Sequence, residues 1–493
     1  MPAASQRSRP PDLPTGVSLA AAAVALVAVS MAVNALSIGR ETTAAAGAAN
    51  LQGLWPLWIA SGVSWLALTA VWWRLRVDAT RPARGGVSGR MRAALVVLAV
   101  AGGVRGMVLV GHETSLSDDI HRFVFDGRTG AAGVNPYLVT PESRVGVADD
   151  DMRWRGEATR AARMNNPEMH TIYLPVSQWV FGAIGKTLSP AGDPARAERR
   201  FRLAFVLFEM IGIGLVLLAL TRAGRSPWWA TLYAWHPLAL IEIAGSGHQD
   251  AIGLPLLVAG LLLASAKPER CRRWVWAIAA AALIKPFVVP AAAFVLRRSP
   301  PAAWGRALVI GIVVTGALGA PLLLSAGGAP VENLRATSER FALKWAHFGS
   351  VYEPLLTAIE WRTPAWGNDP QEQLARGICL LAFLIAGIII WIRSRDAWRG
   401  MSALLLAMIL LSPTAHPWYL LWALILLPMT RSRAVWVASL TLPWGYVVLA
   451  DPVDWTVPAG VMVAAYVPIY AALLLDVGPG RPGRGDPSRT IAA

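Results

Sequence analysis

The sequence predicts an all-α membrane protein, a polytopic transmembrane helical bundle of about 12 to 14 membrane segments. Charged residues make up only 15% of the 493 residues, whereas soluble domains contain roughly 25%. Hydrophobic residues make up 55%. Apolar runs of about 17 to 22 residues recur along the chain, and this length crosses a hydrocarbon core of about 30 Å. An ordinary multi-domain soluble protein is therefore excluded.

The apolar runs predict the transmembrane helices in order. The first run follows Arg7 and Arg9, and its length favours a retained helix over a cleaved signal peptide. The predicted spans are residues 16–36, 52–73, 91–110, 201–221, 228–244, 251–266, 304–324, 374–393, 400–412, 418–430, 434–450 and 456–475.

Two further apolar stretches do not fit a simple span. Residues 171–189 contain an early proline, Ser177 and Gln178, so we expect a helix that lies in the outer interface. Residues 274–297 are broken by a Lys-Pro pair at Lys285 and are too short for two crossings. A hairpin of short, broken helices is predicted there, because irregular backbone is tolerated at membrane depth where it lines a protein cavity.

Arginine and lysine in the short connectors predict the orientation. The connectors "WWRLRVDATRPARGGVSGRMR", "KPERCRR", "RRSPPAAWGR", "RSRDAWR" and "RSR" are basic and are expected in the cytoplasm with both chain ends. The segments expected outside are 111–200, 245–250, 325–373, 412–419 and 451–455. All the motif-like polar clusters then fall on one face of the membrane.

The predicted organisation has four parts. Residues 1–110 form N-terminal transmembrane helices, and 111–200 form a large extracytoplasmic catalytic loop. Residues 201–475 form the transmembrane core, and 476–493 a disordered cytoplasmic tail rich in Gly, Pro and Arg.

Composition and missing motifs exclude several function classes. The net charge of +15 falls in short clusters between apolar runs, so topology explains it better than nucleic-acid binding. Cys271 and Cys379 have no CxxC spacing, so no disulfide, metal cluster or redox role is expected. No P-loop, GxGxxG or HExxH motif occurs. If the chain is an enzyme, its activated substrate is expected to arrive through the membrane.

The stretch "SDDIHRFVFDGRTGAAGVNPY", residues 117–137, directly follows the third span. Asp118 and Asp119 do not share a helix face, so one carboxylate can point into a cavity while the other fixes it. A carboxylate in a partly dry cavity gains proton affinity and can act as a general base. Helix capping is the alternative, and both roles are compatible. Arg122 and Asp126 have the spacing of a helical ion pair and are expected to be scaffold residues.

Charged residues inside predicted spans are costly and are treated as functional. Arg105, Glu209, Glu242 and Lys285 are of this kind. Arg105 lies near the outer end of its span and can instead extend to the interface. Lys285 is expected to bind a phosphate or to pair with one of the glutamates.

The predicted outer turns supply further candidates. "GSGHQD" carries His248 and Asp250, for which a solvated turn is the alternative. "SPTAHPWYLLW" carries His416 and Tyr419; aromatic residues there would ordinarily form an interfacial belt, but a His can donate hydrogen bonds to a phosphate or hydroxyl. "FALKWAHFGSVYEPL" adds side chains suited to stacking on sugars and gripping anions, namely Lys344, Trp345, His347 and Tyr352.

Six motifs in order, between about residues 105 and 430, carry a family resemblance. They are "SDDIHRFVFDGRTGAAGVNPY", "IYLPVSQWVF", "RFRLAFVLFEM", "HPLALIEIAGSGHQDAIGLPLLVAGLLL", "LIKPFVVP" and "LSPTAHPWYLLWALILLP". Together they resemble the GT-C superfamily of integral membrane glycosyltransferases and, more narrowly, the bacterial polyprenol-phosphate-mannose-dependent mannosyltransferases. The chain departs from this pattern in having "YLP" where relatives commonly show two prolines, and in two spans that precede the motif-bearing core.

The resemblance implies an inverting hexosyltransferase on the outer face of a bacterial cytoplasmic membrane. The donor would be a polyprenyl-phosphate sugar, with mannose expected, and the acceptor a lipid-linked or cell-surface glycan. Asp118 would be the general base and Asp119 its companion. No cofactor or metal ligand set is expected. The candidates for holding the donor phosphate or sugar are His416, Arg105, Lys285, His248, Asp250, Tyr419 and Lys344.

Two other classes compete with this interpretation. A transporter or flippase of lipid-linked sugars would also be polytopic, but it should show repeated halves and short loops on both sides. This chain has one long predicted outer segment and no detected repeat. A structural or assembly protein of the membrane would not need motifs confined to one face.

Overall fold

The computed structural model describes residues 47–78, 87–111, 116–145, 164–188, 193–265, 267–365, 367–394, 396–450 and 456–477. In these ranges every regular element is a helix, with one isolated β-bridge between His347 and Thr414. The predicted all-α helical bundle is confirmed. The predicted span 16–36, the outer segment 451–455 and nearly all of the predicted tail lie outside the described residues.

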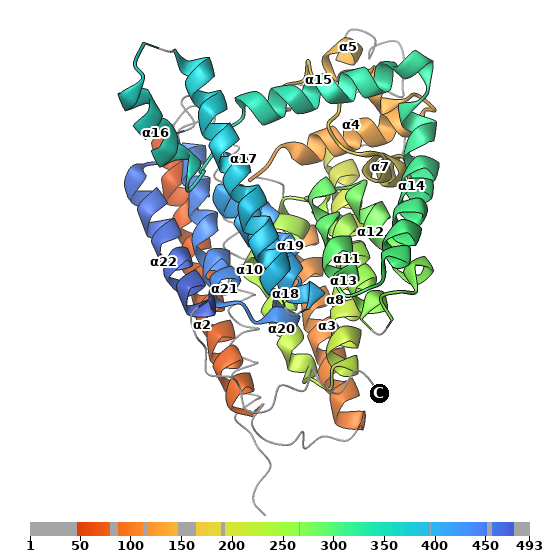
Figure 1. Ribbon diagram of the computed structural model, residues 1–493, viewed down its shortest axis with the longest axis vertical. Helices are drawn as coiled ribbons and strands as arrows, with labels where there is room; N and C mark the ends of the chain where they lie inside the picture. The colour runs from red at the N-terminus through yellow and green to blue at the C-terminus, as the bar shows by residue number, and fades with distance from the viewer. Residues whose placement is uncertain are drawn as a thin grey trace, which may run out of the picture.

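Five described helices are long and apolar enough to cross a membrane. They are α3 (Val87–Gly111), α8 (Pro194–Arg222), α14 (Pro301–Leu323), α17 (Asn368–Arg393) and α22 (Ala459–Val477). Only 11% of the most apolar stretch of α14 and of α17 is buried, so both turn aliphatic side chains outward as lipid-facing helices do. Together with α2 (Gly47–Asp78), these helices run along the length of the molecule (Figure 1).

Two predicted spans are not continuous helices but chains of short helical segments. The span predicted at 228–244 is built from η3 (Pro227–Ala230), α9 (Thr231–Ala234), α10 (Pro237–Ala239) and the π-helix η4 (Leu240–Gly245). The span predicted at 418–430 is built from η8 (Pro417–Leu420), α19 (Leu421–Leu424) and α20 (Leu427–Thr430). Prolines interrupt both stretches because they remove an N–H donor. Most of these residues are buried, which is the condition for irregular backbone at membrane depth.

The hairpin predicted for residues 274–297 is confirmed. It follows η5 (Cys271–Arg273) and consists of α12 (Val275–Ala282), η6 (Pro286–Val288) and α13 (Pro290–Leu296). Lys285 stands at the break with extended backbone angles, φ −142° and ψ 115°. A side chain at such a break can reach a cavity that a continuous helix would have closed.

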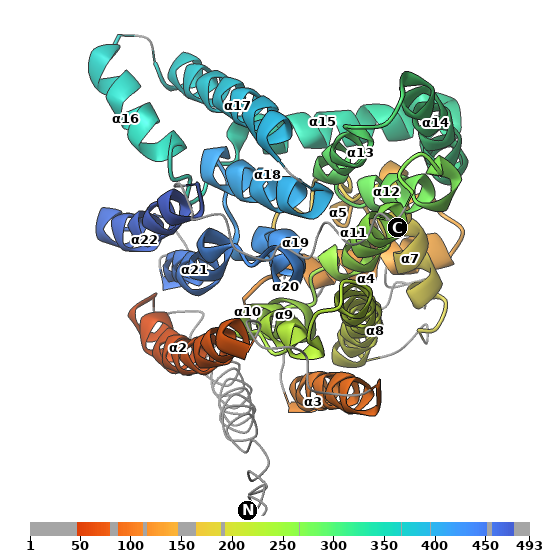
Figure 2. The same cartoon turned by 60° about the horizontal axis from the view of Figure 1, so that its bottom comes forward.

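Shorter helices complete the bundle. They are α11 (Asp250–Ala264), α18 (Ala397–Leu411), α21 (Arg433–Thr441) and η9 (Leu442–Ala450). Figure 2 shows α9, α10, α19 and α20 in the middle of the molecule, with the longer helices α2, α3, α8, α14, α17 and α22 around them.

The predicted outer segments gather at one end of the bundle. The segment 111–200 contributes α4 (Asp119–Ala131), η1 (Pro136–Leu138), α5 (Glu142–Val145) and α7 (Pro175–Gly185). The segment 325–373 contributes η7 (Ala326–Gly328), α15 (Ala329–Lys344) and α16 (Tyr352–Arg362). In Figure 1, α4 and α15 lie across the ends of the long helices. Helix α7 was expected not to span, and its 11 residues give a length of only about 16 Å.

Helices α4 and α7 pack in close backbone contact. A Cβ atom added to Gly185 would lie 2.0 Å from the carbonyl oxygen of Gly127, and one added to Gly127 would lie 2.6 Å from the carbonyl oxygen of Phe181. Only glycine permits this approach. The close contact fixes α4, and with it the position of the acidic pair.

Candidate functional site

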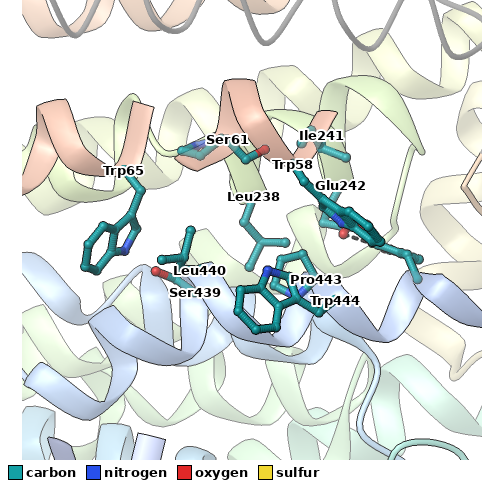
Figure 3. A pocket seen from close by; sticks show the side chains of 12 residues that line it. Trp58, Ser61, Trp65, Leu238, Ile241, Glu242, Ser439, Leu440, Pro443 and Trp444 are labelled. Atoms are coloured by element: carbon teal, nitrogen blue, oxygen red, sulfur yellow. Dashed lines mark hydrogen bonds between the residues drawn. The ribbon is translucent and has the colours of Figure 1, made fainter. Parts of the chain in front are cut away.

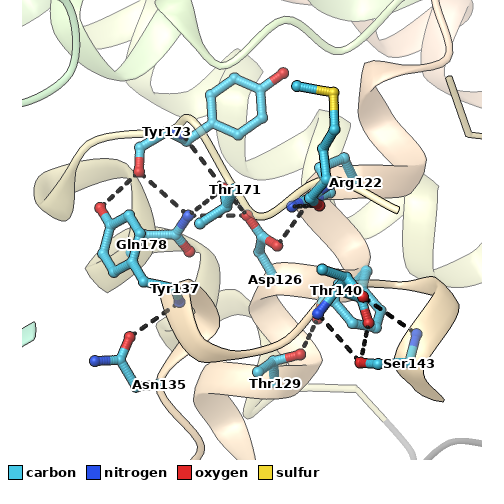
Figure 4. Close-up of polar contacts among 12 residues, drawn as sticks. Arg122, Asp126, Thr129, Asn135, Tyr137, Thr140, Ser143, Thr171, Tyr173 and Gln178 are labelled. Carbon is cyan, nitrogen blue, oxygen red and sulfur yellow. Dashed lines mark hydrogen bonds and ion pairs between the residues drawn. The ribbon is translucent and has the colours of Figure 1, made fainter. Parts of the chain in front are cut away.

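A buried hydrogen-bond network holds α4 in place (Figure 4). Asp126 accepts hydrogen bonds from Arg122 Nε at 3.0 Å, Thr171 Oγ1 at 2.6 Å and Gln178 Nε2 at 2.8 Å. Arg122 also donates to the Met169 carbonyl at 2.9 Å. The predicted scaffold pair of Arg122 and Asp126 is thus confirmed, and it ties α4 to α7 and to the segment before it.

The acidic pair stands where α4 begins. Ser117 Oγ accepts a hydrogen bond from the Asp119 N–H at 3.3 Å, whereas the side chain of Asp118 makes no capping hydrogen bond. Both aspartates are partly exposed. The charge of Asp119 acts on His248 and Tyr419, so its carboxylate lies near the place where two predicted outer turns meet.

The "GSGHQD" turn is buried, so the alternative of a solvated turn does not hold. His248, Gln249 and Asp250 are each 1% exposed. Gly247 has a φ of 75°, in the left-handed region that favours glycine, and lets the chain turn back after η4. Asp250 accepts a 2.6 Å hydrogen bond from Trp422 Nε1, which links the turn to α19.

Four aromatic rings form a continuous stack, which we call the ring stack. His248 lies on Trp418 with ring centroids 4.3 Å apart, Trp418 lies on His416 at 4.2 Å, and His416 lies on His347 at 5.0 Å. The β-bridge holds the last ring: His347 N donates to the Pro413 carbonyl at 3.0 Å. Three segments that are distant in sequence therefore meet in one structure.

Lys285 lies beside the ring stack. Its Nζ is 5.2 Å from the centroid of the Tyr419 ring, and its charge acts on His416. The two glutamates expected as possible partners pair with other residues: Glu209 with Arg105, and Glu242 with His248. Within the described ranges Lys285 forms no ion pair. A partly buried ammonium without a carboxylate partner is suited to an anionic ligand.

The pKa values of two histidines of the ring stack are lowered, which favours the neutral imidazole. Burial, together with the nearby His347, His248 and Lys285, holds the pKa of His416 well below its usual range. Burial also lowers the pKa of His347 to about 4. Each neutral imidazole has one N–H that can donate a hydrogen bond.

The pKa of His248 shifts in the opposite direction and is raised. Burial lowers the pKa of this ring, but the hydrogen bond and charge of Glu242 and the charges of Asp119 and Asp250 raise it by more. The net direction favours the protonated ring. Lys285, and His248 when its ring is protonated, can therefore supply positive charge to the site.

Arg105 and Lys344, two predicted donor-binding residues, have other partners. Arg105 donates to both carboxylate oxygens of Glu209 at 2.6 Å, and both side chains are at most 1% exposed. Lys344 is exposed and pairs with Asp369 at 2.6 Å. Arg105 is thus a structural cation between α3 and α8, and Lys344 lies on the surface.

The Arg105 pair should matter for stability. We expect Arg105→Met to destabilise the protein by about 3–5 kcal/mol, because it leaves the Glu209 charge buried without its partner. Thermal unfolding in detergent measures this loss. The double variant Arg105→Met with Glu209→Met should recover much of it, and a double variant no more stable than the single one would contradict the pairing argument.

Glu242 also lines a pocket between α2, η4 and η9 (Figure 3). Tyr446 Oη donates a 2.5 Å hydrogen bond to Glu242 Oε1 within it. Sequence reasoning named Glu242 only as an intramembrane charge and missed Tyr446, because no motif surrounds this tyrosine. The sequence separation of 204 residues gives no local signal for their contact.

Comparison with known proteins identifies one family model. Residues 361–476 match the MptB C-terminal domain. This region contains α17, α18, the turn with His416 and Trp418, and η9 with Tyr446. No curated protein and no solved structure matches the chain.

Proposed function

We propose that the protein is a membrane glycosyltransferase that moves a hexose, with mannose as the expected sugar, from a polyprenyl-phosphate donor to a glycan acceptor. MptB is a polyprenol-phosphate-mannose-dependent mannosyltransferase, and the match at 361–476 supports the same chemistry here. The proposed site faces the outside of a bacterial cytoplasmic membrane, as the basic connectors predict.

The arrangement of Asp119, Lys285 and the ring stack carries the proposal. The Asp119 carboxylate, an ammonium that forms no ion pair within the described ranges and the imidazoles of the ring stack lie near one another at the end of the bundle that holds the predicted outer segments. Aromatic rings offer stacking surfaces to a sugar, and N–H donors suit a phosphate. A site that transfers a sugar from a lipid phosphate needs both kinds of group.

The proposed reaction is a single inverting displacement. A carboxylate removes the proton from the acceptor hydroxyl, and the hydroxyl oxygen attacks the anomeric carbon as the bond to the phosphate oxygen breaks. The bonding electrons leave with the polyprenyl phosphate. Lys285, His248 and the N–H of His416 would stabilise the negative charge that develops on it.

The assignment of the base rests on the two aspartates of α4. The family resemblance favours Asp118. The charge of Asp119 acts on His248 and Tyr419, so this carboxylate lies close to the ring stack. We therefore propose Asp119 as the base and Asp118 as its companion, and a pair of variants separates the two.

A donor comparison tests this function. Purified protein in proteoliposomes with a glycan acceptor is supplied with polyprenyl-phosphate mannose or with nucleotide-linked mannose. We expect transfer only from the lipid donor. Transfer from the nucleotide sugar alone, or from no polyprenyl-phosphate sugar at all, would contradict the proposal.

A further inference from the structure

Glu242 is a buried carboxylate that the proposed transfer does not use. It lies in the π-helix η4 with 0% exposure, lines the pocket of Figure 3 and contacts His248 of the ring stack. Burying a carboxylate is costly unless nearby groups compensate its charge. Tyr446 donates a hydrogen bond to Oε1. Oε2 has no hydrogen-bond partner among the described residues, and its charge is compensated by His248, whose Nδ1 lies 3.1 Å away.

The geometry around His248 fixes which nitrogen carries its proton. Nδ1 lies 3.1 Å from Glu242 Oε2 and 3.1 Å from the Glu242 backbone oxygen. Both neighbours are acceptors, so Nδ1 is the donor. Nε2 is buried and has no hydrogen-bond partner in the part of the chain that the structure describes. Stacking on Trp418 at 4.3 Å fixes the plane of the ring.

The backbone is shaped to make this contact. The His248 N–H donates to the Glu242 carbonyl at 2.9 Å, so both the backbone and the ring of His248 fold back onto Glu242. The π-helix and the left-handed Gly247 produce this reversal. Such π-helical turns occur frequently at functional sites.

We propose that Glu242 is a positioning residue: it fixes the Nδ1 proton and the orientation of His248, so that Nε2 is the nitrogen offered to the donor phosphate. Tyr446 holds the Glu242 carboxylate in place. This inference rests on the proposed transferase function. The charged or titratable groups that act on His248 are Glu242, Asp119, Asp250 and His416. The three carboxylates favour a protonated ring, whose Nε2–H can donate a hydrogen bond to an anion.

The test is Glu242→Gln in the full-length protein in proteoliposomes. We expect kcat to fall about 10- to 100-fold with little change in KM. Activity that depends on protonated His248 is lost as the pH rises through its pKa. The variant lacks the carboxylate that raises this pKa, so the loss should move to lower pH. Tyr446→Phe preserves packing and should cause a smaller change in the same direction.

A matched control uses a second buried Glu–His pair of the described residues. His121 Nδ1 lies 3.2 Å from Glu198 Oε1, and both side chains are at most 10% exposed. Glu198→Gln should leave the pH profile unchanged. A wild-type kcat and pH profile in Glu242→Gln, or an equal change in Glu198→Gln, would overturn the inference.

Nitrogen NMR of histidine-labelled protein separates this inference from the proposed function. The titration midpoint of His248 should fall in Glu242→Gln, whether or not the protein transfers sugar. An unchanged midpoint would overturn the positioning role. An inactive wild-type protein with a lowered midpoint in the variant would overturn the proposed function and the role of Nε2 toward the phosphate, but leave the control of His248 by Glu242 standing.

Discussion

Asp119→Asn is expected to reduce sugar transfer by about 10³-fold, because an amide cannot accept the proton of the acceptor hydroxyl. The change preserves shape and removes only the charge and basicity. The hydrogen bond from the Asp119 N–H to Ser117 is a backbone contact and should persist, so α4 should still form. Single-turnover transfer from polyprenyl-phosphate mannose measures the effect on the chemical step.

Asp118→Asn is the matched control for the base assignment. We expect about a 10-fold loss from this variant, since it changes the charge beside the base without removing the base. If Asp118→Asn alone abolished transfer, the base would be Asp118, as the family resemblance suggests. Full activity in both variants would contradict a base in this pair.

Lys285→Met is expected to lower kcat by about 10²- to 10³-fold, because it removes a cation that stabilises the departing phosphate. The donor KM should also rise, since the phosphate carries charge before transfer. Steady-state kinetics with polyprenyl-phosphate mannose checks both parameters. Lys285→Arg should recover part of the activity, because it keeps the charge but changes its geometry.

Lys344 provides a second lysine for comparison. Both lysines were candidates from sequence, but Lys344 is exposed and paired with Asp369. We expect Lys344→Met to retain near wild-type kinetics. Equal losses in Lys285→Met and Lys344→Met would indicate a general effect of positive charge on this face and would contradict a specific phosphate site at Lys285.

Sequence patterns predicted the features that depend on local chemistry. Apolar runs predicted the long helices, and the Lys-Pro pair at Lys285 predicted the break in the hairpin. The spacing of Arg122 and Asp126 along the chain predicted their ion pair. In each case the decisive residues lie within one or two helical turns of each other, so propensity and periodicity are sufficient.

Features that depend on tertiary contact were not predictable. Hydropathy did not separate a continuous span from the proline-broken segment at 227–245, because both are equally apolar. The partner of Arg105 is 104 residues away in sequence. The order of rings from His248 to His347 depends on how three turns meet, which no local pattern encodes.

The central claim is that this site breaks the bond between sugar and phosphate, and does not move an intact lipid-linked sugar across the membrane. A donor that carries one label on the sugar and another on the phosphate tests this directly in proteoliposomes. We expect the sugar label to appear in the glycan acceptor while the phosphate label stays with free polyprenyl phosphate. Labels that cross the bilayer together on intact donor, with no labelled acceptor, would contradict the claim and indicate a flippase.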